Sequence, residues 1–226
     1  MKEFDRLVET VEKLRGPEGC PWDREQTHQS LKPYLIEESY EVLESIDRQS
    51  PELLRDELGD LLLQIVLHAQ IAAERDEFTL AQVADSIREK MIRRHPHVFG
   101  DTRVKDVKEI WRNWEKIKKS EQKDSAQTKS ILDTIPAELP ALFRASKVQK
   151  KASRVGFDGR DSQGVLEKIK EEVLELKQAE NTAQKEKLIE EFGDILFSLV
   201  NLSRKMDIDA EDALRLATKK FENRFK

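Results

Sequence analysis

The sequence contains an internal repeat, and this repeat limits the available folds more than any other feature. The motif Glu-Glu-x-x-Glu at 37–41 recurs at 171–175, and Asp-Glu-Leu-Gly-Asp at 56–60 recurs as Glu-Glu-Phe-Gly-Asp at 190–194. Every acidic position in these motifs is displaced by the same 134 residues. Because acidic residues are 45 of 226, six matches at one offset would arise by chance with a probability on the order of 1%. We therefore infer a duplicated structural unit.

Apolar residues in the repeat follow the spacing of a helix. Leu166, Ile169, Val173 and Leu176 are separated by 3, 4 and 3 residues, which places them on one helix face. The chain has only 8 Gly and 7 Pro, which disfavours a turn-rich β fold. The sequence therefore predicts an all-α fold. Amphipathic helices are expected over 37–47, 54–74, 80–94, 107–119, 165–180, 186–205 and 209–225.

A polar segment divides the two copies of the repeat. Residues 118–130 contain a single apolar residue, Ala126, which is typical of a solvated helix end followed by a linker. We expect an N-terminal domain at 1–117 and a C-terminal domain at 131–226. The prediction is thus two tandem, internally duplicated helical-bundle domains.

Composition and charge exclude several classes of protein. The net charge is -5 and the two signs are interspersed, without the basic stripe of a nucleic-acid binder. The longest aliphatic run, 61–63, is far too short to span a membrane. A start without an apolar signal core and a single cysteine, Cys20, lead us to expect a cytoplasmic protein. No Gly-x-x-x-x-Gly-Lys-Ser/Thr loop is present, which excludes a P-loop NTPase.

The repeated acidic residues can converge on one site. On a helix Glu172 and Glu175 lie about 60° apart, and so do Glu191 and Asp194. A short connection predicts antiparallel packing of the two helices, so that both pairs meet beside one apolar interface. We expect the acids to flank inward-facing apolar stripes formed by Ile169, Val173, Leu176, Leu188, Phe192, Ile195 and Leu199. The first-half counterparts of the acids are Glu38, Glu41, Glu57 and Asp60.

These acids have two interpretations. With 38% charged residues, a single Glu-x-x-Glu motif is most often a solvated helix face. The fixed separation of 16 residues between Glu41 and Glu57, and between Glu175 and Glu191, favours metal binding. Four converging carboxylates also repel one another unless a cation is present. Oxygen ligands alone select Mg²⁺, with Mn²⁺ as a substitute.

A magnesium site of this kind indicates a phosphorylated substrate, since the ion bridges carboxylate and phosphate oxygens. Such a site needs cationic side chains nearby. Candidates are Lys168 and Lys187, each one turn before an acidic pair, and Lys220 and Arg224 on the last predicted helix. The alternative for the two lysines is ordinary i,i+4 pairing with Glu172 and Glu191.

The motifs together resemble one family. Segments 16–28 (GPEGCPWDREQTH), 94–99 (RHPHVF), 155–158 (VGFD) and 220–225 (KFENRF), with the acidic motifs, resemble the MazG nucleoside triphosphate pyrophosphohydrolases in order along the chain. The resemblance implies an all-α fold with tandem domains, a homodimer, and Mg²⁺-dependent hydrolysis of a nucleoside triphosphate to the monophosphate and pyrophosphate.

The resemblance also implies roles for individual residues. The implied metal ligands are Glu172, Glu175, Glu191 and Asp194, with Glu38, Glu41, Glu57 and Asp60 in the first half. The catalytic set adds Glu171 and Glu190, either of which is a candidate base for the attacking water. Substrate contacts are expected from Lys168, Lys187, Lys220, Arg224, Lys90 and Arg94.

The two halves differ in their flanking cations. Lys168 corresponds to Tyr34, and Lys187 corresponds to Leu53. We therefore expect turnover mainly in the C-terminal domain. Some relatives carry a Trp-x-x-x-Lys element after the last helix; in this sequence that pattern occurs at Trp114 and Lys118, which we expect to contact the substrate, with helix packing as the alternative for Trp114.

Two other functions fit the same sequence. One is a catalytically silent helical module that senses nucleotides or binds a partner. The other is a structural dimer stabilised by divalent ions.

Overall fold

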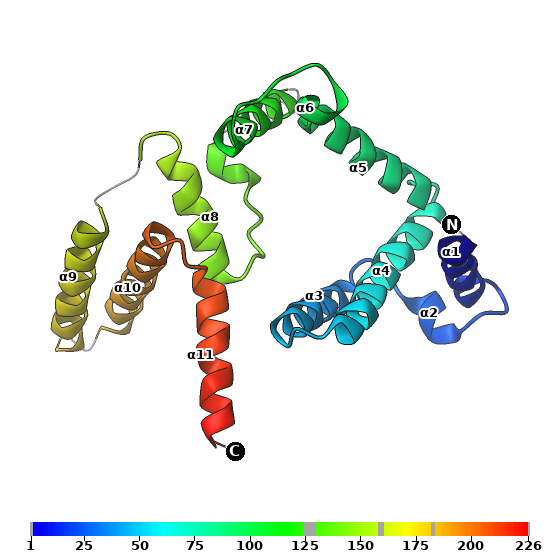
Figure 1. Ribbon diagram of the computed structural model, residues 1–226. Helices are drawn as coiled ribbons and strands as arrows, with labels where there is room; N and C mark the ends of the chain where they lie inside the picture. Colours follow the sequence, from blue (N-terminus) through cyan, green and yellow to red (C-terminus); the bar gives the residue numbers. More distant parts are fainter. Residues whose placement is uncertain (1, 124–129, 158–160, 182–183, 226) are drawn as a thin grey trace. The chain divides into compact units, whose positions relative to one another are not determined.

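The computed structural model describes residues 2–123, 130–157, 161–181 and 184–225. They form two compact units, Met1–Ser120 and Glu121–Lys226. Within the described residues the regular structure is entirely helical, which confirms the all-α prediction (Figure 1). In the same residues, no helix combines the length and the apolar composition that a bilayer crossing requires.

The first unit is a helical hairpin with further helices around it. Its helices are α1 (Lys2–Arg15), α2 (Pro21–Glu25), α3 (Lys32–Asp47), α4 (Pro51–Ala73), α5 (Leu80–Arg94), α6 (Pro96–Phe99) and α7 (Val107–Lys123). Helices α3 and α4 form the hairpin, and α1 and α5 contact α4. Helix α7 continues to Lys123, so the predicted linker at 118–130 begins inside a helix; residues 124–129 lie outside the described part.

Helices α3 and α4 begin earlier than periodicity predicts, at Lys32 and Pro51 rather than at 37 and 54. In both helices proline stands in the first turn, where its missing N–H costs nothing. Ser50 caps α4 by accepting a hydrogen bond from the Leu53 N–H at 3.3 Å. The tight turn before it needs a left-handed residue, and Gln49 supplies this with φ 52°.

The core of the first unit lies where α1 crosses α4. Val11, Leu31, Val66, Leu67 and Ile71 form this buried cluster. Burial of such side chains stabilises the fold by about 1.5–3 kcal/mol each. The core therefore fixes the second half of α4, and the first half of α4, which carries Glu57 and Asp60, extends beyond it.

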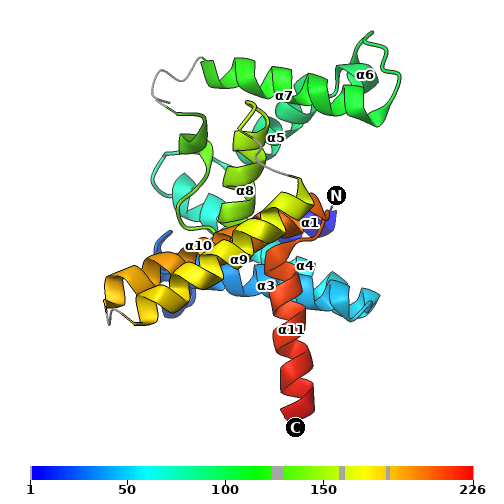
Figure 2. The same cartoon turned by 90° about the vertical axis from the view of Figure 1, so that its left-hand side faces the viewer.

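The second unit repeats this plan. It contains a 3₁₀ helix (Ile131–Thr134) and the helices α8 (Ala141–Ser153), α9 (Ser162–Glu180), α10 (Lys185–Lys205) and α11 (Ala210–Phe225). Helices α9 and α10 lie side by side as an antiparallel hairpin, and α8 and α11 contact α10 (Figures 1 and 2). Asp161 begins α9 by accepting the Gly164 N–H at 2.9 Å.

The duplication is visible in the packing as well as in the sequence. At the N-cap of α3 and along the helix, Leu31 and Ser45 are buried and Glu38 is half-buried, seven residues apart; the buried residues of α9 are Val165, Glu172 and Ala179, each 134 residues later. The turns after the hairpins also match, because each contains a left-handed aspartate, Asp76 and Asp207. The inferred repeat is therefore a structural unit of two antiparallel helices and their neighbours.

The helical wheel was wrong about three of the seven apolar side chains expected to face inward; the other four, Ile169, Leu176, Leu188 and Ile195, are half-buried. Val173, Phe192 and Leu199 are exposed by 36, 56 and 44%, whereas Glu172 and Glu191 are buried at 5 and 9%. The buried residues of α9 are Val165, Glu172 and Ala179, and Val173 lies about 100° around the helix from Glu172, away from this buried stripe.

Candidate metal centres

The hairpin of the second unit gathers three carboxylates. Glu172 and Glu175 come from α9 and Glu191 from α10, and one carboxylate oxygen of each lies within 4.8 Å of the others. Glu175 is half-buried, whereas Glu172 and Glu191 are buried in the seam. Two of the three acids are thus removed from water by the same contact that holds the hairpin together.

This crowding changes the acidity of the Glu191 carboxyl group on α10. Burial, followed by the charge of Glu175, raises the pKa of Glu191, and Glu172 adds to the effect while Lys187 opposes it. A raised carboxylate pKa means that the negative charge at this position is not fully compensated by the protein.

Lys168 lies directly against the cluster. Its Nζ is 2.9 Å from Glu172 Oε1 and 3.2 Å from Glu171 Oε1. The hydrogen bond to Glu172 is the main reason that the pKa of the Lys168 ammonium is raised. The i,i+4 pairing considered for Lys168 is therefore present, and it brings a cation to the edge of the carboxylate cluster.

The hairpin of the first unit gathers the equivalent acids. One carboxylate oxygen each of Glu38, Glu41 and Glu57 lies within 4.8 Å of the others, in a more exposed setting. Burial, then Asp60 and Glu41, raises the pKa of Glu38; burial, then Glu41 and Asp60, raises the pKa of Glu57. At the position of Lys168 stands Tyr34, whose ring meets Trp22 edge to face with centroids 5.9 Å apart.

Both clusters fit a hard divalent cation. Each supplies three carboxylate oxygens and neither supplies nitrogen or sulfur, a donor set that suits Mg²⁺, Mn²⁺ or Ca²⁺. Ligands of an octahedral Mg²⁺ at about 2.1 Å are about 3.0 Å apart when adjacent and about 4.2 Å apart when opposite, so the oxygens of each cluster, which lie within 4.8 Å of one another, would draw together around the ion. The uncompensated charge on Glu38, Glu57 and Glu191 is what such an ion would neutralise.

The two aspartates predicted as ligands stand apart from the clusters. Asp194 follows Glu191, and Asp60 follows Glu57, by one turn; both are exposed, and the three-carboxylate groups found among the described residues do not include them. Asp60 is nonetheless close enough to act on the pKa of Glu38 and Glu57. Their role as ligands stays a prediction, as does the role of the exposed Lys187 and Glu190 beside Glu191.

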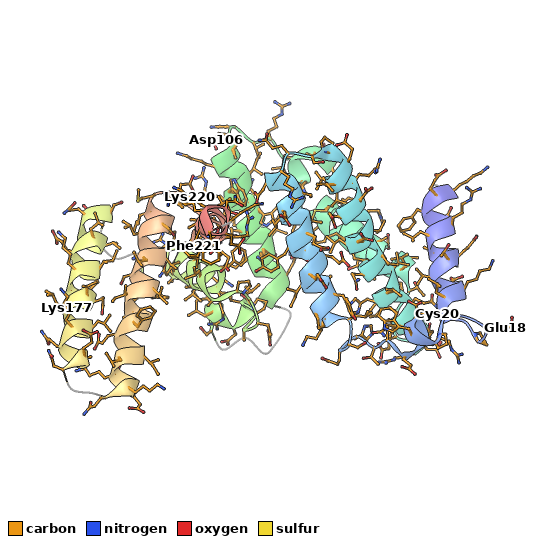
Figure 3. The ribbon with its side chains drawn as sticks, turned by 90° about the horizontal axis from the view of Figure 1, so that it is seen from below. Glu18, Cys20, Asp106, Lys177, Lys220 and Phe221 are labelled. Carbon is orange, nitrogen blue, oxygen red and sulfur yellow. The ribbon has the colours of Figure 1, made fainter. Side chains whose placement is uncertain are left out.

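The cations of α11 lie away from the second cluster. Helix α10 stands between α9, where Lys177 is labelled, and α11, where Lys220 is labelled (Figure 3). Lys220 and Arg224 are exposed on the last turns of α11, and among the described residues no ion pair joins either to the carboxylates. Their contact with substrate stays a prediction.

The first-half candidates form a group of their own. The Arg94 guanidinium lies 5.3 Å from the Trp114 ring centroid, and the His95 ring meets the same indole edge to face with centroids 5.0 Å apart. Trp114 is half-buried, so the helix-packing interpretation applies to it in this unit. Lys90 precedes Arg94 by one turn on α5, and Lys118 follows Trp114 by one turn on α7. Their predicted contacts with substrate remain untested.

Sequence reasoning identified the acids but missed the burial of Glu172 and Glu191. The signal was present in the seven-residue series Val165, Glu172 and Ala179. It places a branched residue two turns before the acid and a small residue two turns after it. Such a series is typical of a helix–helix seam.

Fold and site together define a class: all-α proteins whose duplicated helical hairpins can each hold a divalent cation. The family model of the MazG nucleotide pyrophosphohydrolase domain matches residues 26–99 and 160–226 of this chain. The chain therefore belongs to the MazG family of nucleoside triphosphate pyrophosphohydrolases, which are hydrolases, as the resemblance implied.

Three relatives match almost the whole of this chain. The Thermotoga maritima nucleoside triphosphate pyrophosphohydrolase/pyrophosphatase MazG is 53% identical over 223 residues, 99% of this chain and 84% of the relative. The Escherichia coli K12 nucleoside triphosphate pyrophosphohydrolase is 46% identical over 229 residues, 100% and 87% of the two chains. The Bacillus subtilis protein YabN is 50% identical over 224 residues, 99% of this chain and 45% of YabN.

Proposed function

We propose that this chain hydrolyses nucleoside triphosphates to monophosphate and pyrophosphate with Mg²⁺, mainly at the C-terminal cluster. Family membership supports the reaction class. The observation that carries the choice of site is the buried meeting of Glu172, Glu175 and Glu191, with Lys168 at its edge. Mn²⁺ is expected to substitute because its ligand preference is similar.

The proposed chemistry divides among named side chains. Glu172, Glu175 and Glu191 would hold the ion, and Asp194, one turn after Glu191 on α10, would join them. When bound, Mg²⁺ supplies charge neutralisation of the triphosphate and a more acidic water. A water oxygen attacks the α-phosphorus, the bond between that phosphorus and the α,β-bridging oxygen breaks, and pyrophosphate leaves. Glu171 or Glu190 accepts the proton of the water.

Lys168, Lys187, Lys220 and Arg224 are proposed to bind the phosphates. Phosphate oxygens approaching three carboxylates need such cations to offset repulsion. The N-terminal hairpin has Tyr34 and Leu53 in place of the two lysines, which is the reason for proposing that it turns over more slowly.

We also propose that the chain works as a homodimer. The α9–α10 hairpin leaves large apolar side chains exposed, among them Leu174 at 58%, Ile189 at 64% and Phe192 at 56%. The α3–α4 hairpin does the same with Ile36 at 59% and Ile46 at 52%. Two helices alone cannot bury such faces, whereas the equivalent hairpin of a second copy completes a four-helix bundle with a self-complementary contact.

The position of bond cleavage tests the proposed reaction. Hydrolysis of an NTP in ¹⁸O-water with Mg²⁺ should place the label in the monophosphate and release one pyrophosphate per turnover. Label in pyrophosphate or in orthophosphate would contradict attack at the α-phosphorus. Comparing Glu171→Gln with Glu190→Gln identifies the base, because loss of a general base costs about 10²–10⁴ in rate.

A further inference from the structure

Lys168 places a cation at the C-terminal cluster before any metal is bound. We propose that Lys168 is a built-in counter-ion, which neutralises Glu172 in the metal-free protein and moves to the triphosphate when the divalent ion arrives. This inference rests on the proposed function of the C-terminal cluster. It differs from a simple phosphate contact because it makes the lysine a competitor of the bare metal ion.

The geometry lets one side chain serve both positions. Lys168 and Glu172 are i and i+4 on α9, and Nζ contacts Glu172 Oε1 at 2.9 Å. The lysine side chain is 41% exposed, whereas the Glu172 side chain is 6% exposed. The ammonium therefore reaches from the solvent edge onto a buried carboxylate. A lysine has a flexible four-carbon stem, so its charge can leave this position without movement of the helix.

The first hairpin provides a natural comparison within the same chain. It has the same three carboxylates, and at the position of Lys168 it has Tyr34. Glu37 and Glu38 correspond to Glu171 and Glu172, so the acids that Lys168 pairs with are present in both hairpins. Within this group of Lys168, Glu171 and Glu172, the lysine is the residue that the first hairpin replaces.

Competition follows from this placement. A bare Mg²⁺ ion that binds Glu172 must displace an ammonium that already occupies one of its oxygens, so Lys168 weakens binding of the ion alone. A Mg²⁺–triphosphate complex offers the displaced ammonium a new partner, so Lys168 strengthens binding of the complex. The C-terminal cluster is thereby tuned to bind ion and nucleotide together, and the N-terminal cluster lacks this coupling.

The test uses the full chain with the N-terminal cluster removed by Glu38→Gln and Glu41→Gln, so that titration calorimetry reports the C-terminal cluster. In this background Lys168→Met is compared with Lys170→Met. The control makes the same charge change on the same helix at an exposed position, about 160° around the helix from Glu172. Circular dichroism checks that each variant is folded.

Two ligands are titrated, Mg²⁺ alone and a triphosphate with a non-hydrolysable α,β linkage in saturating Mg²⁺. Lys168→Met should tighten Mg²⁺ binding by about twofold to fivefold, the range for a partly exposed ion pair, and should weaken binding of the nucleotide complex. Lys170→Met should change neither. A purely structural role for Lys168 would move both affinities in the same direction.

The outcomes separate this inference from the proposed function. Unchanged or weaker Mg²⁺ binding by Lys168→Met overturns the counter-ion role and leaves the metal centre in place. No Mg²⁺ binding in the background or in Lys168→Met overturns the metal centre and the inference with it.

The reverse substitution gives an independent arm. With the C-terminal cluster removed by Glu172→Gln and Glu175→Gln, Tyr34→Lys should weaken Mg²⁺ binding at Glu38, Glu41 and Glu57 by a similar factor. Tyr34→Gln controls for loss of the ring contact with Trp22. Equal affinity in the two Tyr34 variants would contradict the competition.

Discussion

At the scale of single residues, position in the hairpin seam decides what an acid does. Glu172 and Glu38 occupy the same repeat position, yet Glu172 is buried and paired with Lys168, whereas Glu38 is half-buried and crowded by acids that raise its pKa. The sequence identified both acids through the repeat. It could not predict their different burial, because the wheel assigns a face to each residue and does not say which face a partner helix covers.

The difference between these two acids predicts unequal effects on turnover. Glu172→Gln should reduce pyrophosphate release by about 100-fold or more, since it removes a metal ligand rather than an outer contact. Glu38→Gln should change it by less than about threefold, because turnover is assigned to the other hairpin. A colorimetric pyrophosphate assay with both variants decides this, and equal losses would refute the assigned asymmetry.

His68 gives the first unit a dependence on pH. Its Nδ1 lies 2.8 Å from Nδ1 of His28 with the ring planes within 4°, so the rings share a hydrogen bond in one plane. Burial, and then His28, lowers the pKa of His68 below 6.5. The neutral ring is therefore favoured in the folded state, and this stability is present above pH 6.5 and lost as the pH falls below it.

Thermal melting of wild type and His68→Phe at pH 7.5 and pH 5.5 measures this contribution. Acidification should lower the melting temperature of wild type more than that of the variant. His95→Phe serves as a control for the loss of a histidine elsewhere in the unit. If His68→Phe loses as much stability on acidification as wild type, the protonation of His68 is not the cause.

At the scale of the helices, the repeat and the periodicity predict seven helices of the structure, α3, α4, α5, α7, α9, α10 and α11, and the predicted ranges do not include α1, α2, α6 or α8. The predicted boundaries of α5 coincide with those of the structure, and those of α10 differ by one residue. The starts of α3 and α4 were missed because proline interrupts the apolar pattern but is compatible with a first turn. Three residues of the predicted inward-facing stripes, Val173, Phe192 and Leu199, are exposed, because each helix of a hairpin turns only one face toward its partner and these residues lie outside it.

Glycines in the middle of the second hairpin helices point to that partner. Gly59 and Gly193 stand at the same repeat position inside α4 and α10, and apart from the adjoining residues and the nearby backbone of the same helix, no described atom lies within 4 Å of where a Cβ would stand at either. Glycine in a helix interior costs about 1 kcal/mol relative to alanine. Packing within each unit does not explain why these two positions lack a side chain. We attribute the two glycines to close approach of the second copy.

Gly193→Ala tests this attribution with two measurements. Helix propensity predicts a gain of up to about 1 kcal/mol in the unfolding free energy of the monomer. Sedimentation equilibrium should show a weaker dimer, because the added methyl group separates the helices. The control is Asn201→Ala, at a half-buried position about two turns after Gly193 on the same helix, and it should leave the dimer unchanged. A stabilised Gly193→Ala protein with an undisturbed dimer would refute the close approach.

At the scale of the whole molecule, duplication has preserved the acid-bearing hairpin while changing the cations around it. The family and the hydrolase class follow from the order of motifs along the chain, which sequence alone contains. The oligomeric state does not follow from the sequence, because exposed apolar residues such as Ile189 and Phe192 do not show which surface covers them.

The proposed homodimer predicts a dimer mass in sedimentation equilibrium, and Phe192→Glu should shift this mass toward the monomer. A monomeric wild type would refute the dimer.

Calorimetric titration of Mg²⁺ into wild type and into the triple variant Glu172→Gln, Glu175→Gln, Glu191→Gln measures the metal centre without relying on turnover. Wild type should show saturable binding at both hairpins, and the triple variant should lose the C-terminal contribution while remaining folded. Superimposable isotherms from the two proteins would mean that these buried acids hold no ion.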